Sequence, residues 1–123
     1  MASIIIGTGT QQGIFLLLGK KTTVIGRDEA LPLQLEDERV SRKHCQFRFD
    51  PSDNQYRLLD MQSTNGTYLN GKRVPGETIL TDGDEVQVGD TKIAFALEDP
   101  TDKVSAMAVF KKVGERRRST LIR

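Results

Sequence analysis

The sequence has few of the features that mark secreted or membrane proteins. It contains one cysteine and no tryptophan among its 123 residues. Because a single thiol, Cys45, cannot form an internal disulfide, a reducing compartment is favoured. The longest apolar runs, residues 4–6 and 14–18, are far below the ~20 residues of a membrane helix. Residues 1–7 also lack the basic region of a signal peptide. We therefore expect a cytoplasmic protein with no membrane partner.

Patterns typical of enzymes and metal sites are missing as well. His44 and Cys45 are adjacent, and neighbouring residues of a strand face opposite sides, so they cannot form a catalytic pair. Residues 82–84 begin like a calcium loop but lack its later ligands. Residues 19–22 depart from a phosphate-binding loop in spacing and in residue type. We expect no catalytic residues, no metal and no cofactor.

The charge is nearly balanced overall but unevenly distributed. Lysine and arginine number 18 against 17 acidic residues, for a net charge of +1. Residues 103–123 hold seven basic residues and one acid, whereas residues 1–102 hold eleven basic and sixteen acidic residues. Nucleic-acid-binding domains usually present a basic field, so the acidic body predicts no nucleic-acid partner.

Short apolar runs separated by turn dipeptides predict an all-β fold. Cys45, Phe47 and Phe49 alternate with polar residues, as on a strand with one buried face. Asn70-Gly71 is a strong hairpin signal. Pro32 lies within the alternating run of residues 31–35, which predicts an edge strand or the start of one. The pattern predicts about eleven strands in a β-sandwich or barrel.

The character of the sequence changes near residue 98. We interpret residues 1–98 as one domain and residues 99–123 as a basic tail or linker. A short helix is an option over residues 104–113, with Val104, Met107, Ala108 and Val113 near one face and Gly114 ending it.

Three segments at strand–loop junctions are candidates for binding. They are Gly26-Arg27, residues 41–44 (Ser-Arg-Lys-His) and residues 63–67 (Ser-Thr-Asn-Gly-Thr). Loops at the ends of sandwiches often carry recognition residues. Guanidinium, hydroxyl and amide groups are suited to a phosphate monoester and the backbone beside it.

The order and spacing of these segments resemble the forkhead-associated (FHA) domain, over about residues 4–97. The resemblance implies an FHA-type β-sandwich of eleven strands that recognises phosphothreonine peptides, without catalysis, in Ser/Thr-kinase signal transduction. It implies the following ligand contacts: Arg27 and Ser41 on the phosphate, Arg42 on phosphate or peptide, Thr64 on the phosphate and threonine methyl, and Asn65 on the peptide backbone. It implies loop-shaping roles for Gly26, His44, Gly66 and Asn70. The implied partners are phosphothreonine-containing proteins, such as a Ser/Thr kinase or its substrates.

Other functions stay open. One is a phosphorylation-independent interaction scaffold, another is the sensory domain of a larger regulator, and a third is binding of an anionic surface through the tail. Ser119 and Thr120 follow three arginines, so they are candidate phosphorylation sites for a kinase that prefers basic residues upstream. Phosphorylated Thr120 is then a candidate ligand for its own or a neighbouring domain, whereas a solvated basic run is the plainer interpretation.

Overall fold

The computed structural model describes the backbone of residues 2–122 and the side chains of residues 2–112. The strands are β1 (Ser3–Ile6), β2 (Phe15–Leu17), β3 (Thr23–Gly26), β4 (Leu33–Gln34), β5 (Cys45–Asp50), β6 (Gln55–Asp60), β7 (Thr67–Leu69), β8 (Lys72–Arg73), β9 (Thr78–Leu80), β10 (Glu85–Val88) and β11 (Thr91–Ala96). The helices are the 3-10 helix η1 (Gly9–Gln11) and the α-helix α1 (Lys103–Ile122).

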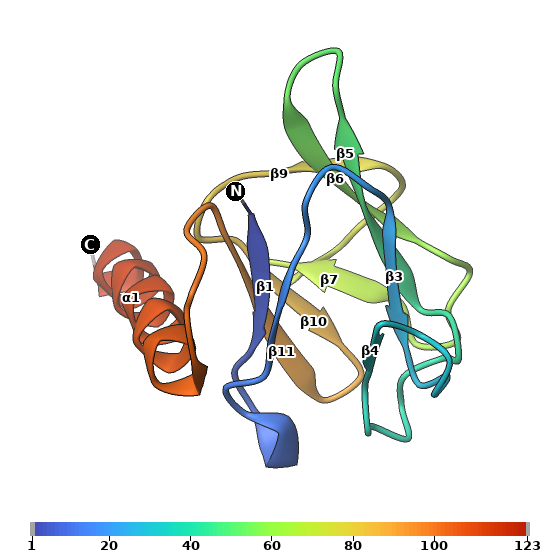
Figure 1. Ribbon diagram of the computed structural model, residues 1–123, viewed down its shortest axis with the longest axis horizontal. Coiled ribbons are helices and arrows are strands. Elements are labelled where there is room, and N and C mark those ends of the chain that lie inside the picture. Colours follow the sequence, from blue (N-terminus) through green and yellow to red (C-terminus); the bar gives the residue numbers. More distant parts are fainter. Residues whose placement is uncertain (1, 123) are drawn as a thin grey trace.

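The strands form two sheets (Figure 1). Sheet A has the order β2-β1-β11-β10-β7-β8, and sheet B has the order β4-β3-β5-β6-β9. All pairs are antiparallel except β3 with β4. The predicted all-β sandwich of about eleven strands is therefore confirmed, with an α-helix added at its side.

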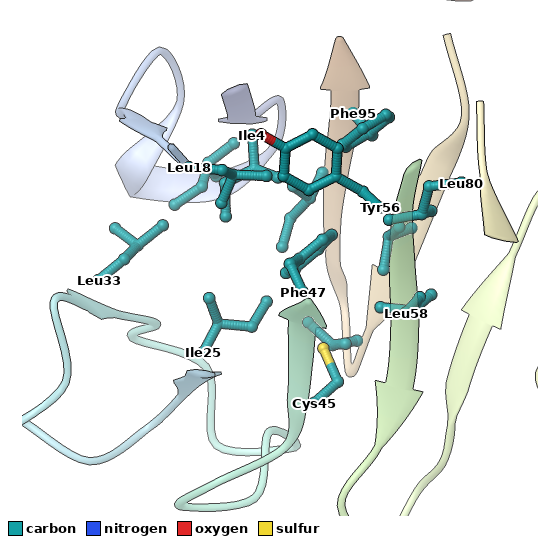
Figure 2. Close-up of a cluster of buried hydrophobic side chains, with 14 of the residues drawn as sticks. Ile4, Leu18, Ile25, Leu33, Cys45, Phe47, Tyr56, Leu58, Leu80 and Phe95 are labelled. Carbon is teal, nitrogen blue, oxygen red and sulfur yellow. The ribbon is translucent and has the colours of Figure 1, made fainter. Parts of the chain in front are cut away.

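The core lies between the two sheets. On β5, Cys45 and Phe47 are fully buried while Gln46 and Arg48 are only half-buried, as the alternation predicted. Figure 2 shows Cys45 and Phe47 in one cluster with Ile4, Ile25, Leu58 and Phe95 of other strands. Burial of such side chains from both sheets supplies most of the stability of a sandwich, at about 1.5–3 kcal/mol for each large side chain.

Two local predictions are also confirmed. β4 pairs with β3 alone and forms the edge of sheet B, with Pro32 just outside it. Asn70 and Gly71 both have positive φ angles, 51° and 86°, between β7 and β8. Two left-handed residues produce the twist that a two-residue hairpin needs.

Helix α1 covers the outer face of sheet A, the face turned away from the core (Figure 1). Ala106 and Val109 are buried against Ile5 and Ala96 of the sheet, with Phe15 packed beside them. The Phe110 ring lies over the backbone of Gly7, where an added Cβ atom would come within 2.0 Å of the ring. Ile5 is therefore covered on the side opposite to Ile4 and Ile6, so both faces of β1 are buried.

The sequence interpretation of this segment was wrong in two respects. The helix continues past Gly114 to Ile122, because one glycine within a helix costs only about 1 kcal/mol relative to alanine. The face that packs on the sheet contains Ala106, Val109 and Phe110, whereas Val104 is 81% exposed. Between residues 104 and 110, apolar residues occur on all sides of this helix, so contact with the sheet decides which of them are buried. Ser119 and Thr120 lie outside the residues whose side chains the structure describes.

Within residues 2–122, neither helix combines the length and apolar character that would be needed to cross a membrane.

Candidate functional site

The three segments singled out in the sequence lie on neighbouring loops at one end of the sandwich, at the lower right of Figure 1. The first follows β3, the second leads into β5, and the third connects β6 with β7. The Ser41 carbonyl accepts a hydrogen bond from the N–H of Arg27 (3.0 Å). Oγ of Ser41 accepts one from the N–H of Thr64 (3.0 Å). Ser41 therefore joins all three segments into one surface.

Gly26 allows the second segment to approach the end of β3. A Cβ atom added to Gly26 would lie 2.2 Å from the carbonyl oxygen of Arg42 and 2.8 Å from that of Ser41. No side chain fits in that space, so glycine is required by close backbone approach. The approach lets the N–H of Asp28 donate to the Arg42 carbonyl (3.1 Å) beside the Arg27–Ser41 bond.

The Arg27 side chain is exposed and is anchored at one nitrogen atom. Its Nε donates to the backbone carbonyl of Val40 (3.0 Å). The backbone carbonyl of Arg27 accepts from the side-chain amide of Gln34 (3.0 Å). Among the residues with described side chains, no carboxylate pairs with it. The terminal nitrogen atoms are thus available for a bidentate interaction with an anion.

His44 connects the second and third segments from beneath. Its ring is fully buried. Nδ1 accepts from the N–H of Ser41 (3.0 Å), so the proton must be on Nε2, which donates to the carbonyl of Gly66 (2.8 Å). Gly66 has a φ angle of +83°, which favours glycine at this bend. The imidazole therefore fixes the separation between two loops.

Asp60 holds the third segment at its other side. Its carboxylate accepts from the N–H of Ser63 (3.0 Å), from Oγ of Ser63 (2.5 Å) and from Oγ1 of Thr67 (2.7 Å). Burial raises the pKa of Asp60, but these hydrogen bonds outweigh it and the net pKa is lowered. The sequence analysis did not select Asp60. Its inward position, two residues after Leu58 and four after Tyr56 on β6, is the signal that could have found it.

Asp37 is a second structuring residue that the sequence analysis missed. Its carboxylate accepts from Oγ1 of Thr91 (2.7 Å), from the N–H of Asp90 (2.8 Å) and from the N–H of Arg39 (2.9 Å). The bonds with Asp90 and Thr91 join the loop between β4 and β5 to the turn between β10 and β11. The three bonds together outweigh the effect of burial, so the pKa of Asp37 is lowered. No local signal marks this role, because Thr91 is more than fifty residues away in the sequence.

The remaining predicted ligand residues are exposed on the same surface. Arg42 and Thr64 are exposed side chains of the second and third segments. Asn65 is also exposed, and its Nδ2 donates to the carbonyl of Arg39 (2.8 Å). Its Oδ1 has no partner among the described residues and is available to a peptide N–H.

Asn70 lies away from this surface, at the β7–β8 turn. Its Nδ2 donates to Oδ1 of Asp84 (3.0 Å), and its Oδ1 accepts from the N–H of Glu85 (2.9 Å). The side chain therefore connects the hairpin to the start of β10.

The groups of the site are arranged for binding an anion rather than for nucleophilic chemistry. Both ring nitrogen atoms of His44 are engaged by backbone groups. The thiol of Cys45 is fully buried, and burial raises its pKa. Over the part of the chain that the structure describes, no group of three or more potential metal ligands is found.

Known proteins are similar to this chain in sequence and in fold. The sequence profile of the FHA domain matches residues 23–89. An oxoglutarate dehydrogenase inhibitor from Corynebacterium jeikeium is 35% identical over 94 residues, which span 76% of this chain and 63% of that protein. The glycogen accumulation regulator GarA from Mycolicibacterium smegmatis is 34% identical over 101 residues, spanning 82% of this chain and 62% of that protein. This chain thus matches less than two-thirds of the length of either relative.

Solved structures agree with these matches. One, from a study of phosphothreonine-dependent FHA domain interactions, has a TM-score of 0.70 and 30% identity, covering 80% of this chain and 97% of that one. Another, the FHA domain of FhaA complexed with an intracellular domain, has a TM-score of 0.69 and 30% identity, covering 77% and 99%. The family match includes all three segments, and the two similar structures cover 80% and 77% of this chain. The chain therefore belongs to the FHA domain family.

Proposed function

We propose that this chain is a non-catalytic module that binds phosphothreonine peptides at the surface formed by Arg27, Ser41, Arg42, Thr64 and Asn65. The observation that carries the proposal is the network through Ser41 and His44, which holds three loops together beneath an unpaired guanidinium. Such a surface is formed before a ligand arrives, so little ordering is needed on binding.

The chemistry of these side chains matches that of the ligand. A phosphate monoester brings about −1.5 to −2 charges and three acceptor oxygens. Arg27 and Arg42 supply charge, Ser41 and Thr64 supply hydroxyl groups, and Asn65 supplies an amide for the peptide backbone. Burial of the threonine methyl group would favour phosphothreonine over phosphoserine by about 0.8 kcal/mol, or several-fold in affinity.

The partners that we propose are Ser/Thr-kinase substrates or a kinase itself. FHA relatives include proteins described as an inhibitor and as a regulator, and one similar structure holds the Mycobacterium tuberculosis protein EmbR with a phosphopeptide. Phosphorylated Thr120 is a further candidate ligand. Helix α1 lies on the outer face of sheet A, on the other side of the sandwich from the proposed binding surface (Figure 1). Thr120 would therefore have to leave the helix to reach the binding surface of its own domain.

The test is a calorimetric titration with a degenerate phosphothreonine library and with one peptide in phosphothreonine, phosphoserine and unmodified forms. We expect binding of the phosphothreonine form and none of the unmodified form. Arg27→Ala should weaken binding by about 2–5 kcal/mol, about 30-fold or more, because the phosphate loses a charged partner. The control variant is Lys21→Ala, which also removes one exposed positive charge, but at the end of β3 opposite to Arg27. It should leave the affinity within twofold.

The same titration separates the alternatives. A peptide carrying phospho-Thr120 tests recognition of the tail. Equal affinity of Arg27→Ala and the unaltered chain would refute the pocket assignment. Capture of a partner that survives phosphatase treatment would favour a phosphorylation-independent scaffold instead.

A further inference from the structure

Arg73 lies beside the proposed phosphothreonine surface although no motif assigns it a role. It is on β8, opposite Tyr68 of β7 in the antiparallel register. Its guanidinium covers Gly66, because a Cβ atom added to Gly66 would lie 2.8 Å from Nε and 2.9 Å from Cζ of Arg73. Gly66 directly follows Asn65, so this guanidinium is next to the loop that would hold the peptide backbone.

The charge of Arg73 is not neutralised within the described part of the chain. The other arginines of the nearby strands are paired: Arg48 with Glu77, and Arg57 with Asp50 and Asp53. No carboxylate lies within ion-pair distance of Arg73 among the described side chains. An exposed, unpaired guanidinium is a donor for a carboxylate or a phosphate.

A concavity beside Arg73 provides space for such a group. It is lined by Gln62, Val74, Pro75 and Gly76 together with Arg73 and Asp60. The Asp60 carboxylate would repel an anion placed beside it, and its oxygen atoms already accept three hydrogen bonds. An anion in this concavity would therefore lie on the side of the Arg73 guanidinium.

We propose that Arg73 forms a second anion-binding position, which recognises a carboxylate or a second phosphate on the same peptide that presents the phosphothreonine. The inference rests on the proposed function. The supporting observation is that the two positions adjoin. The loop between β6 and β7 contains Thr64 and Asn65, and the Arg73 guanidinium packs on Gly66 of the same loop. The module would then prefer ligands with a second negative group, such as acidic or doubly phosphorylated peptides.

The test uses the full chain and three sets of phosphothreonine peptides. The first set has neutral flanks, the second has one glutamate moved through the flanking positions, and the third has a second phosphoresidue moved in the same way. We expect one position at which glutamate tightens binding about fivefold. The second phosphate should tighten binding more than glutamate there, because it carries more charge.

Variants then assign the gain to Arg73. Arg73→Ala should abolish it while the affinity for the neutral-flank peptide stays within twofold. Lys72→Ala is the matched control, because adjacent strand residues face opposite sides and Lys72 points away from Gly66. Arg73→Lys should retain part of the gain, since the charge remains and the bidentate geometry is lost. Urea midpoints of the three variants, equal to that of the unaltered chain, would verify folding.

The outcomes separate the two proposals. Phosphopeptide binding without a gain at any position, or a gain that persists in Arg73→Ala, overturns the Arg73 site alone. Failure of every phosphopeptide to bind overturns the proposed function and the Arg73 site together. A gain from the second phosphate but not from glutamate would identify a doubly phosphorylated ligand.

Discussion

Replacement of His44 is the most informative perturbation of the three loop segments that form the proposed binding surface. The ring is fully buried and forms two hydrogen bonds with backbone groups, at Ser41 and at Gly66. His44→Ala removes both bonds and leaves the Gly66 carbonyl buried without this partner. His44→Asn places an amide oxygen near the position of Nδ1, and His44→Gln places an amide nitrogen near that of Nε2. The three variants therefore separate the two bonds.

The magnitude follows from burial. Each buried polar group left without a partner costs about 1–3 kcal/mol, and the emptied ring volume adds a cavity cost. We expect His44→Ala to lose at least about 3 kcal/mol of folding stability, a large part of the 5–15 kcal/mol typical of such domains. Asn should recover about 1 kcal/mol through Ser41, and Gln a similar amount through Gly66.

Urea unfolding followed by far-ultraviolet circular dichroism measures these differences, since the chain has no tryptophan. Gln46→Ala, two residues later and on the outer face of β5, is the control and should change stability by less than about 0.5 kcal/mol. A His44→Ala variant within 1 kcal/mol of the unaltered chain would refute the argument. So would Asn and Gln variants that are no more stable than the alanine variant.

Two further predictions concern Asp60 and helix α1. Because the folded-state pKa of Asp60 is lowered, its contribution to stability is present above the unfolded value of about 4 and is lost as the pH falls through the folded pKa. The urea midpoints of Asp60→Asn and the unaltered chain should therefore differ at pH 7 and converge toward pH 2, and a constant difference would contradict this. Phe110→Ala should cost about 1–3 kcal/mol because its ring packs on Gly7, whereas Val104→Ala, at an 81% exposed position, should cost less than about 0.5 kcal/mol. Equal losses would show that α1 does not dock through Phe110.

Much of the sandwich could be predicted because its signals are local. The alternation at Cys45 and Phe47 and the left-handed turn at Asn70-Gly71 act within a few residues. The edge position of β4 follows from Pro32, which cannot donate to a neighbouring strand. The order of strands within each sheet was not predicted, because the pairing of β1 with β11 joins opposite ends of the domain and leaves no local signal.

The three loop segments of the proposed binding surface were partly predictable. Their motif residues are close in sequence within each segment, whereas the residues that hold the loops in place act over long separations. Asp37 reaches Thr91, and His44 reaches Gly66. Single-sequence patterns contain no distance information of this kind.

Helix α1 was the weakest prediction, for a physical reason. Its own sequence lacks a clear apolar face, so contact with the sheet determines that Ala106, Val109 and Phe110 are the residues that pack against it. The run of three isoleucines in β1 was the available signal, because a strand with apolar residues on both faces needs cover on both.

The carboxylate of Asp37 has a consequence for the entropy of recognition. It fastens the loop between β4 and β5 to the opposite sheet through Thr91 and Asp90, and it holds the loop itself through the backbone N–H of Arg39. Ordering residues 36–40 only when a ligand arrived would cost about 1–2 kcal/mol for each residue, or about 5–10 kcal/mol in all. That loss occurs during folding instead, so a peptide that binds as we propose would meet a loop whose conformational freedom is already gone.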